Sequence, residues 1–231
     1  MLARLTHWYH TAQTVMRLPV AQLHFDSRLN PREVPMTYQR FMAPHPRYKI
    51  IPHKTIGVAL LDLRDHGDPA RYLSWLKKRY NSVAAARKAR GLGYVTQPID
   101  RNAYVEDIFA INTSLNERQG RPMAEHYQRK TQHFEVEPNF RYLGVLDSGG
   151  RLSAYCNMGF YGNFAAFSQV MGYRNNDGAM HLLIIDVICQ LLEEGRVDYL
   201  MYDTYFGALP GMQRFKSMFG FTPYRVRYSL S

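Results

Sequence analysis

A group of polar residues, Tyr202-Asp203-Thr204-Tyr205, lies at the C-terminal end of a strand predicted at residues 197–203. In α/β sheets, ligands gather beyond such strand ends. A carboxylate in that position can accept a proton from a reacting group, so Asp203 is the first candidate for a general base. Tyr202 or Tyr205 would orient or relay the proton. The alternative is that Asp203 forms a hydrogen bond with a neighbouring loop and has no catalytic role.

Tyrosine and asparagine side chains give a second set of candidates. Tyr155 and Asn157 lie on one face of a predicted strand, because side chains alternate along a strand. The asparagine amide both donates and accepts hydrogen bonds, so Asn157, Asn175 and Asn176 are candidates for contact with the polar edge of a substrate. A buried Asn157 that bonds to the backbone fits the same pattern equally well.

Histidines give a weaker signal, for a metal. His45 and His53, with Tyr48 between them, and His7 with His10 are potential ligands. None of them has a strong metal-binding spacing such as His-Glu-x-x-His. A protein-bound metal therefore stays an open alternative to histidines that contact phosphate or solvent.

Hydrophobic periodicity predicts the elements that position these residues. The strongest pattern is a helix at residues 179–194, where apolar residues repeat at helical spacing. A second helix is predicted at residues 68–90, with Asp68 as its N-cap and Pro69 in its first position. Residues 1–55 are interrupted by prolines and give no clear element. The other segments are predicted strands at 55–63, 92–99, 142–146, 151–160, 164–173 and 222–230, and helices at 104–115, 122–133 and 211–219.

Charge divides the chain into two parts. Residues 1–101 hold 17 Lys and Arg against six Asp and Glu, a net charge of +11, whereas residues 102–231 have a net charge of −1. Between residues 71 and 90 there is no acidic residue. A helix with a single sign of charge is suited to lie along phosphates, although a basic protein of high solubility is the alternative. The predicted DNA-binding residues are Lys77, Lys78, Arg79, Arg87, Lys88 and Arg90.

The order of strands and helices over residues 92–231 resembles the GNAT acyltransferase superfamily. The segment at residues 211–223, Gly-Met-Gln-Arg-Phe-Lys-Ser-Met-Phe-Gly-Phe-Thr-Pro, is especially similar, because a helix there ends in Phe-Gly-Phe and leads into the final strand. The resemblance implies an α+β fold with a mixed central sheet flanked by helices. Residues 92–231 would form the catalytic domain, and residues 1–91 a basic N-terminal extension that contacts DNA.

The resemblance also implies a donor site and an acceptor site. The donor would enter between the strands at 164–173 and 197–203, and the following helix N-terminus would hold a pyrophosphate. The acceptor pocket would be shaped by the region of the first two helices, which makes Arg101 and Ser114 candidates for catalysis. Ser114 is also a residue type that ends helices, so a structural role is equally open.

The predicted donor-binding loop departs from the family pattern, Gln/Arg-x-x-Gly-x-Gly/Ala. It reads Arg174, Asn175, Asn176, Asp177 and Gly178. An aspartate beside a pyrophosphate is repulsive. If the loop holds a pyrophosphate, the donor is a coenzyme A ester; if Asp177 only caps the following helix, the donor lies elsewhere in the cleft and is of another kind, such as an aminoacyl compound.

The whole chain also resembles the DNA-modification proteins of bacteriophages. This resemblance implies a transferase that adds a carbamoylmethyl (acetamide-type) group to the 6-amino group of adenine in phage duplex DNA, which protects the DNA from host restriction. Double-stranded DNA and a small-molecule donor would be its partners. Two alternatives are an aminoacyl-tRNA- or acyl-CoA-dependent N-acyltransferase and a DNA-binding protein on an inactive transferase scaffold.

Composition predicts where such a protein would act. The start of the chain lacks the apolar core of a signal peptide, and no apolar run approaches the roughly 20 residues that span a membrane. Cys156 and Cys189 both lie in apolar segments, which indicates buried free thiols in a reducing compartment. We therefore expect a protein of the bacterial host cytoplasm.

Overall fold

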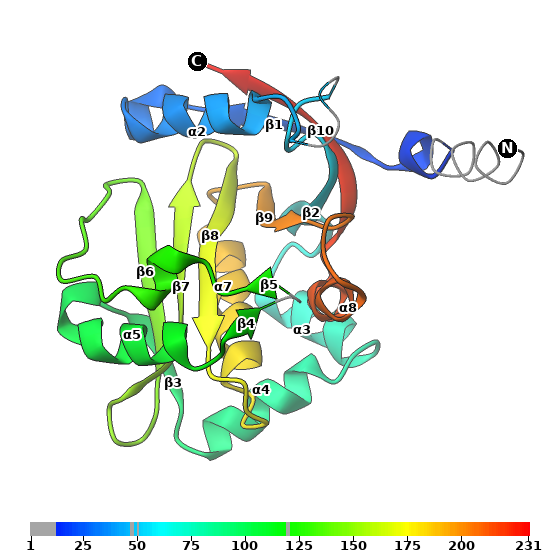
Figure 1. The fold of residues 1–231 in the computed structure, drawn as a ribbon. Coiled ribbons are helices and arrows are strands. Elements are labelled where there is room, and N and C mark those ends of the chain that lie inside the picture. Colours follow the sequence, from blue (N-terminus) through cyan, green and yellow to red (C-terminus); the bar gives the residue numbers. More distant parts are fainter. Residues whose placement is uncertain (1–12, 47–48, 50, 119–120) are drawn as a thin grey trace, which may run out of the picture.

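The computed structural model describes residues 13–46, 49, 51–118 and 121–231 of the chain. Eight strands form one mixed sheet (Figure 1), and β4 (Glu117–Arg118) pairs separately with β5 (Arg121–Pro122). Across the large sheet the order is β1 (Val20–Phe25), β10 (Thr222–Leu230), β2 (Ile56–Asp62), β9 (Tyr199–Thr204), β8 (Phe164–Gly172), β7 (Leu152–Phe160), β6 (Phe140–Leu146) and β3 (Val95–Pro98).

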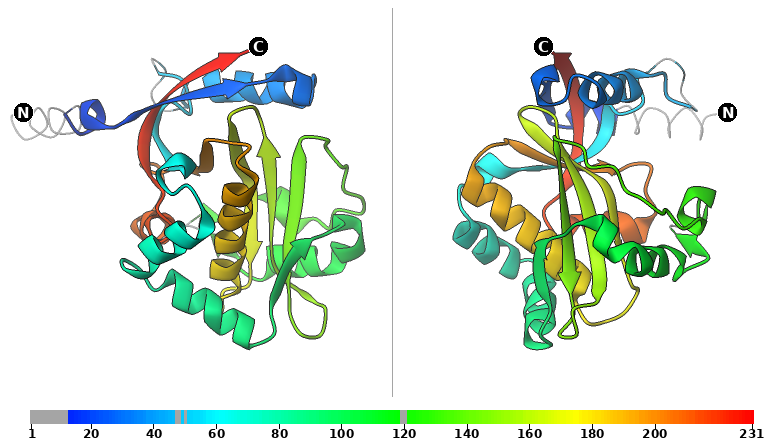
Figure 2. Two further views of the ribbon diagram at one scale, coloured as in Figure 1. Left: turned by 180° about the vertical axis from the view of Figure 1, so that it is seen from behind. Right: turned by 90° about the vertical axis from the view of Figure 1, so that its left-hand side faces the viewer.

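Helices cover both faces of this sheet, which gives the α+β architecture expected from the sequence. Figure 2 shows α7, α3 and α4 on one face and α5 with α6 on the other, while α2 crosses one end of the strands. α7 is buried along most of its length because its apolar residues extend beyond a single stripe. The helix bounds are α2 (Glu33–Met42), α3 (Pro69–Lys77), α4 (Ser82–Gly91), α5 (Val105–Thr113), α6 (Glu125–Gln128), α7 (Ala179–Glu194) and α8 (Pro210–Ser217).

The single helix predicted at residues 68–90 is wrong, because α3 ends at Lys77 and α4 begins at Ser82. Asp68 does cap α3, through a hydrogen bond from the Arg71 N–H. The chain breaks because Ser82 is fully buried and its hydroxyl donates to the Met218 carbonyl. That contact turns the chain so that both α3 and α4 pack against α7.

The helix predicted at residues 122–133 is also too long, because α6 covers only Glu125–Gln128. The chain after it is held in an irregular path by Asn102. The Asn102 side chain accepts from the Phe134 N–H at 2.8 Å and donates to the Phe134 carbonyl at 3.1 Å. These bonds satisfy backbone groups that a longer helix would have paired.

The N-terminal segment, which gave no clear prediction, contributes to the same sheet as the rest of the chain. β1 runs parallel to β10, and β2 lies antiparallel between β10 and β9. Buried and exposed positions alternate in the first strand, as in any strand with one buried face. The predicted division at residue 91 therefore does not coincide with an edge of the sheet, and a separate DNA-contacting role for residues 1–91 stays a prediction.

Candidate functional site

The parallel strands β8 and β9 diverge in the middle of the sheet (Figure 1), and a cleft lies where they separate. Their pairing joins Phe164 to Tyr199, Ala165 to Leu200 and Ala166 to Met201, after which β8 continues to Gly172 away from β9. The cleft has a volume of about 1290 Å³. The end of β8, the start of α7, the end of β9, one side of α8 and part of α2 line it.

A β-bulge in β8 faces this cleft. Asn157 of β7 pairs with Gln169, and the next residue, Met158, pairs with Phe167, which leaves Ser168 as the extra residue. The Ser168 hydroxyl donates to the Asn157 carbonyl at 3.2 Å, and Ser168 lines the cleft. Bulges re-aim side chains next to active sites, and nothing in the local sequence predicted this one.

Asp203 lies in the cleft at the end of β9, as the strand-end rule predicted. It is the one non-glycine residue with positive φ, +54°, in the described part of the chain, and such strained residues gather at functional sites. Its carboxylate forms an ion pair with Lys54. Partial desolvation in the cleft raises the pKa of Asp203, whose side chain is 57% exposed, but Lys54 and the nearby Lys216 outweigh it, so the pKa lies below its usual range. Asp203 is thus ionised at neutral pH and bonded to a neighbouring loop, which leaves both interpretations of its role open.

Lys216 was missed by the sequence analysis. Only 3% of the residue is exposed, its Nζ donates to the Thr204 carbonyl at 2.7 Å, and it lies 4.9 Å from the centre of the Tyr202 ring. Burial lowers its pKa to about 8, although Asp203 opposes that shift. The sequence feature that could have identified Lys216 is its position among the apolar residues Phe215 and Met218 of a short helix.

The two predicted tyrosine partners of Asp203 have different surroundings. Tyr202 lines the cleft, and its ring packs against Phe167 at a centroid distance of 5.1 Å. The Tyr205 hydroxyl instead shares a 2.8 Å hydrogen bond with the Ser217 hydroxyl of α8. Tyr202 is therefore the one of the two that the structure places beside Asp203 in the cleft.

Asn157 and Tyr155 belong to a network of hydrogen bonds beside the cleft, which is partly buried at Gln169 and buried at Asn112. Asn157 donates to Gln169 at 2.9 Å, Gln169 donates to the Tyr155 hydroxyl at 2.7 Å, and that hydroxyl donates to Asn112 at 2.6 Å. The Asn157 Oδ1 at the end of the network is buried and has no hydrogen-bond partner in the described part of the protein. An unpaired buried acceptor costs about 1–3 kcal/mol. Binding of a ligand that donates a hydrogen bond to the Asn157 Oδ1 would therefore be favourable.

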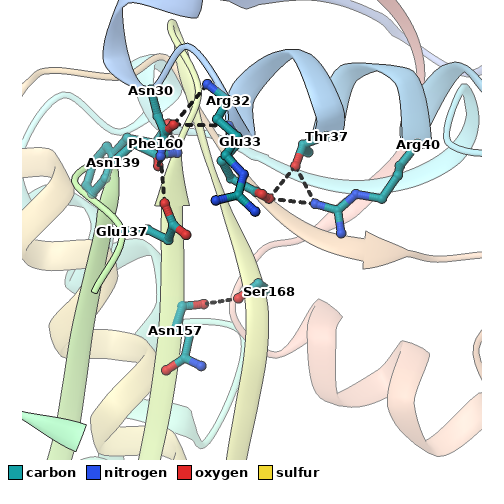
Figure 3. Close-up of polar contacts among 10 residues, drawn as sticks. All are labelled: Asn30, Arg32, Glu33, Thr37, Arg40, Glu137, Asn139, Asn157, Phe160 and Ser168. Carbon is teal, nitrogen blue, oxygen red and sulfur yellow. Dashed lines mark hydrogen bonds and ion pairs between the residues drawn. The ribbon is translucent and has the colours of Figure 1, made fainter. Parts of the chain in front are cut away.

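Helix α2 forms a polar wall over one end of the cleft (Figure 3). Glu33 accepts from the Thr37 hydroxyl at 2.8 Å and from Arg40 at 2.6 Å, and both donors line the cleft. Asn30 fixes the start of the helix, because its side chain donates to Asn139 at 3.0 Å. The sequence analysis did not single out these residues: their contacts within α2 are local, but the position of α2 over the cleft depends on contacts between distant residues, such as Asn30 with Asn139.

The loop before α7 is closed by its own aspartate. Asp177 accepts from the Ala179 N–H at 2.9 Å, from the Tyr94 hydroxyl at 2.7 Å and from Asn175 at 2.6 Å. Asp177 thus bonds the first N–H of α7 from the position before the N-cap residue Gly178, and its role as helix cap or donor contact stays a prediction.

The helix α4 covers the same loop. Lys88 donates to the Asn176 carbonyl at 2.6 Å. Gly178 has φ +90°, and a Cβ there would collide with the Ala85 carbonyl. Arg174 is exposed at the cleft rim. The carboxylate of Asp177 therefore lies at the helix N-terminus where a pyrophosphate would bind.

Replacing Asp177 with alanine is expected to lower the free energy of unfolding by about 1 kcal/mol, the usual net contribution of a hydrogen bond, because the first N–H of α7 loses its acceptor. Because the Asp177 carboxylate already lies at this helix N-terminus, wild-type protein is expected to bind coenzyme A only weakly, and calorimetric titration measures this directly. Asp147→Ala is a matched control, because Asp147 accepts backbone N–H groups in the β6–β7 turn and not at a helix N-terminus. Tight, saturable coenzyme A binding that Asp177→Ala weakens would contradict this assignment.

Arg101 and Ser114 lie apart from Asp203. Arg101 stacks 3.8 Å from the centre of the Tyr142 ring and donates to the Glu135 carbonyl. Ser114 donates to the Ile111 carbonyl at 2.7 Å at the end of α5, which is a helix-ending contact. Neither residue is among the described residues that line the cleft, and a catalytic role for either stays a prediction.

The six predicted DNA-binding residues are all exposed on α3, α4 and the turn between them. Two of them also contact the protein: Lys88 bonds to the loop before α7, and Arg90 pairs with Asp186. Arg79 lies over the Trp75 ring, with its guanidinium carbon 4.8 Å from the ring centre.

The structure gives little support for the predicted metal ligands. The rings of His45 and His53 lie 5.6 Å apart, and no cluster of three potential metal ligands occurs among the residues that the structure describes. His7, His10 and Tyr48 lie outside those residues. In the described chain, no helix has the length and apolar character needed to cross a bilayer.

Comparison with known proteins identifies the fold. No protein-family model and no curated protein matches the sequence. Among solved structures, the chain resembles FemX with a TM-score of 0.56 and 8% identity, over 73% of this chain and 59% of that one. It also resembles the C-terminal domain of a putative lysylphosphatidylglycerol synthetase from Agrobacterium fabrum, with a TM-score of 0.44 and 15% identity over 73% and 58% of the two chains.

A tandem GNAT protein from the clavulanic acid biosynthesis pathway matches with a TM-score of 0.43 and 20% identity, over 74% of this chain and 50% of that one. The chain thus spans between half and three fifths of the length of these three structures. Identities this low show the fold alone. The chain shares its fold with FemX over the matched part, and this is an α+β fold with a mixed sheet flanked by helices, as expected from the order of the strands and helices.

Proposed function

We propose that this protein is a group-transfer enzyme of the N-acyltransferase type, which moves an acyl or related group from an activated donor to an amino group in the cleft. The observation that carries the proposal is the opening between β8 and β9, which leads to the strained, ionised Asp203. The resemblance to the GNAT acyltransferases supports the same reaction class, although a fold alone does not fix a function.

The chemistry requires a proton acceptor beside the amine. When the amine nitrogen attacks the donor carbon, a C–N bond forms and the leaving group departs with its bonding electrons. The nitrogen then carries a positive charge and becomes acidic, so even a carboxylate of lowered pKa can take its proton. In the proposal Asp203 accepts this proton, while Lys54 and Lys216 position the carboxylate from either side.

The donor we propose carries the carbamoylmethyl group on a leaving group of its methylene carbon and is not a coenzyme A ester; attack of the amine forms the N–CH2 bond, and the bond from that carbon to the leaving group breaks. Asp177 already accepts the first N–H of α7, and a second anion there would meet a like charge. A donor that does not depend on this helix N-terminus can enter the cleft along β8.

The acceptor we propose is the 6-amino group of adenine in duplex DNA, converted to its carbamoylmethyl derivative as a protection against restriction. The exposed cations on α3 and α4 support a polyanionic substrate. The base would have to leave the helical stack, at a cost of a few kcal/mol. Aromatic residues of the cleft, such as Phe41, Tyr127 and Tyr202, offer stacking surfaces for a flipped base.

A second candidate function is an aminoacyl-tRNA-dependent N-acyltransferase. The same two observations favour it, because exposed cations fit the phosphates of tRNA and the Asp177 carboxylate at the start of α7 disfavours coenzyme A. The two functions differ in the acceptor, so a direct product analysis separates them.

The test is expression of the chain in a bacterium, followed by mass spectrometry of digested DNA and tRNA. We expect a new deoxyadenosine derivative with the mass of one added carbamoylmethyl group, present with the wild type and absent with Asp203→Asn. Unmodified adenine from abundant, folded protein would contradict the DNA acceptor. Consumption of an aminoacyl-tRNA without any modified DNA would favour the second candidate.

A further inference from the structure

A second hollow lies where the turn between α3 and α4 meets α8. It has a volume of about 520 Å³, and we call it the α3–α4 notch. α8 separates it from the cleft: Met212 and Phe215 of this helix line the cleft, whereas Arg214 and Ser217 line the notch. The residues that give the notch its polar character are Lys77, Lys78, Arg79, Asn81, Arg214 and Ser217.

Two buried hydrogen bonds fix the shape of the notch. The hydroxyl of Tyr72 donates to the Phe219 carbonyl at 3.1 Å, and the hydroxyl of Ser82 donates to the Met218 carbonyl. Both donor residues are fully buried. They hold the α3–α4 turn against the end of α8, so cations from three segments are fixed around one hollow.

The cations of the notch have no acidic partner. Lys77, Lys78, Arg79 and Arg214 form no ion pair with any acidic side chain that the structure describes, and no acidic residue lines the notch. Arg90, only a short way along α4, is by contrast paired with Asp186. Bringing four like charges together without a counter-ion is unfavourable, and a bound anion would relieve that repulsion.

We propose that the α3–α4 notch binds a backbone phosphate of the duplex DNA substrate, while the target base lies in the cleft on the other side of α8. This inference rests on the proposed function, which supplies DNA as the acceptor. A helix with its side chains is about 10–12 Å wide, and a DNA strand advances about 3.4 Å per nucleotide. The bound phosphate therefore lies about three nucleotides from the target adenine.

The test compares the double variant Lys78→Gln/Arg214→Gln with the wild type in duplex DNA binding over a range of salt concentrations. Loss of the contact with the one bound phosphate is expected to reduce the slope of log affinity against log salt by about 0.9. At about 0.1 M salt this corresponds to about 8-fold weaker binding. The matched control, Arg151→Gln/Arg227→Gln, removes the same charge from exposed positions outside the notch and is expected to change the slope far less.

The position of the phosphate is tested separately with duplexes in which a single phosphate is replaced by a neutral methylphosphonate. Replacement about three nucleotides from the target adenine is expected to weaken binding to the wild type but not to the notch variant. An unchanged slope in the notch variant, or equal changes in variant and control, would overturn the proposal. The proposal would also be overturned if the protein did not bind duplex DNA but bound tRNA with a salt dependence that the notch variant reduces. Because binding is measured without turnover, a missing DNA product would count against the proposed function and not against the notch.

Discussion

Replacing Asp203 with asparagine is expected to lower the rate of group transfer by about 10²- to 10⁴-fold, the usual contribution of a positioned proton acceptor. Asparagine keeps the size of the side chain and tolerates the positive φ that Asp203 adopts, so the backbone should not change. What is lost is the negative charge that accepts the proton and pairs with Lys54. Single-turnover rates measured by mass spectrometry of the product test this directly.

Asp198→Asn is the matched control, because Asp198 precedes the same strand and accepts from Asn163 at 3.3 Å. Both variants should retain duplex DNA binding and a melting temperature close to that of the wild type. If Asp203→Asn transfers the group at the wild-type rate, Asp203 has no part in the mechanism, and its contact with Lys54 is structural.

The pH dependence of stability should reveal the buried amine of Lys216. Its pKa is about 8 in the folded protein, against 10.5 for a free lysine. Between these values the unfolded chain binds the proton more tightly than the folded one, so the free energy of unfolding rises with pH across this window. A shift of this size corresponds to about 3 kcal/mol.

Lys216→Met should remove this dependence, because methionine has similar length and no titrating group. The measurement is the free energy of unfolding from urea denaturation at intervals between about pH 7 and pH 11, expressed as the difference between wild type and variant. Lys77→Met, at an exposed position of α3, is the control for loss of a lysine. A constant difference between wild type and Lys216→Met over the whole range would show that Lys216 is not desolvated.

Local sequence patterns predicted the elements that depend on local contacts. α7 was visible because its apolar residues repeat at helical spacing, and the β6–β7 hairpin because a turn separates two apolar runs. The break between α3 and α4 was not visible. It depends on Ser82 reaching the Met218 carbonyl, 136 positions away in the sequence, and helical propensity alone continues through that point.

The site was predictable to a similar degree. Asp203 was found because polar residues at the end of a buried strand carry information about ligands. Lys216 was overlooked because a lysine on a short amphipathic helix normally keeps its charge in water. The wall made by Glu33, Thr37 and Arg40 depends on where α2 crosses the sheet, and that placement is set by long-range contacts such as Asn30 to Asn139.

The position of β10 between β1 and β2 has a consequence for how the chain folds. β1 and β2 are made early in synthesis, but each needs β10, which ends at Leu230, as a neighbour. Until β10 emerges from the ribosome, these two strands have unpaired backbone groups and exposed apolar faces. This half of the sheet therefore forms late, because pairing of β10 with β1 and β2 closes a loop that contains most of the chain. We expect chains that stall before residue 222 to be prone to aggregation.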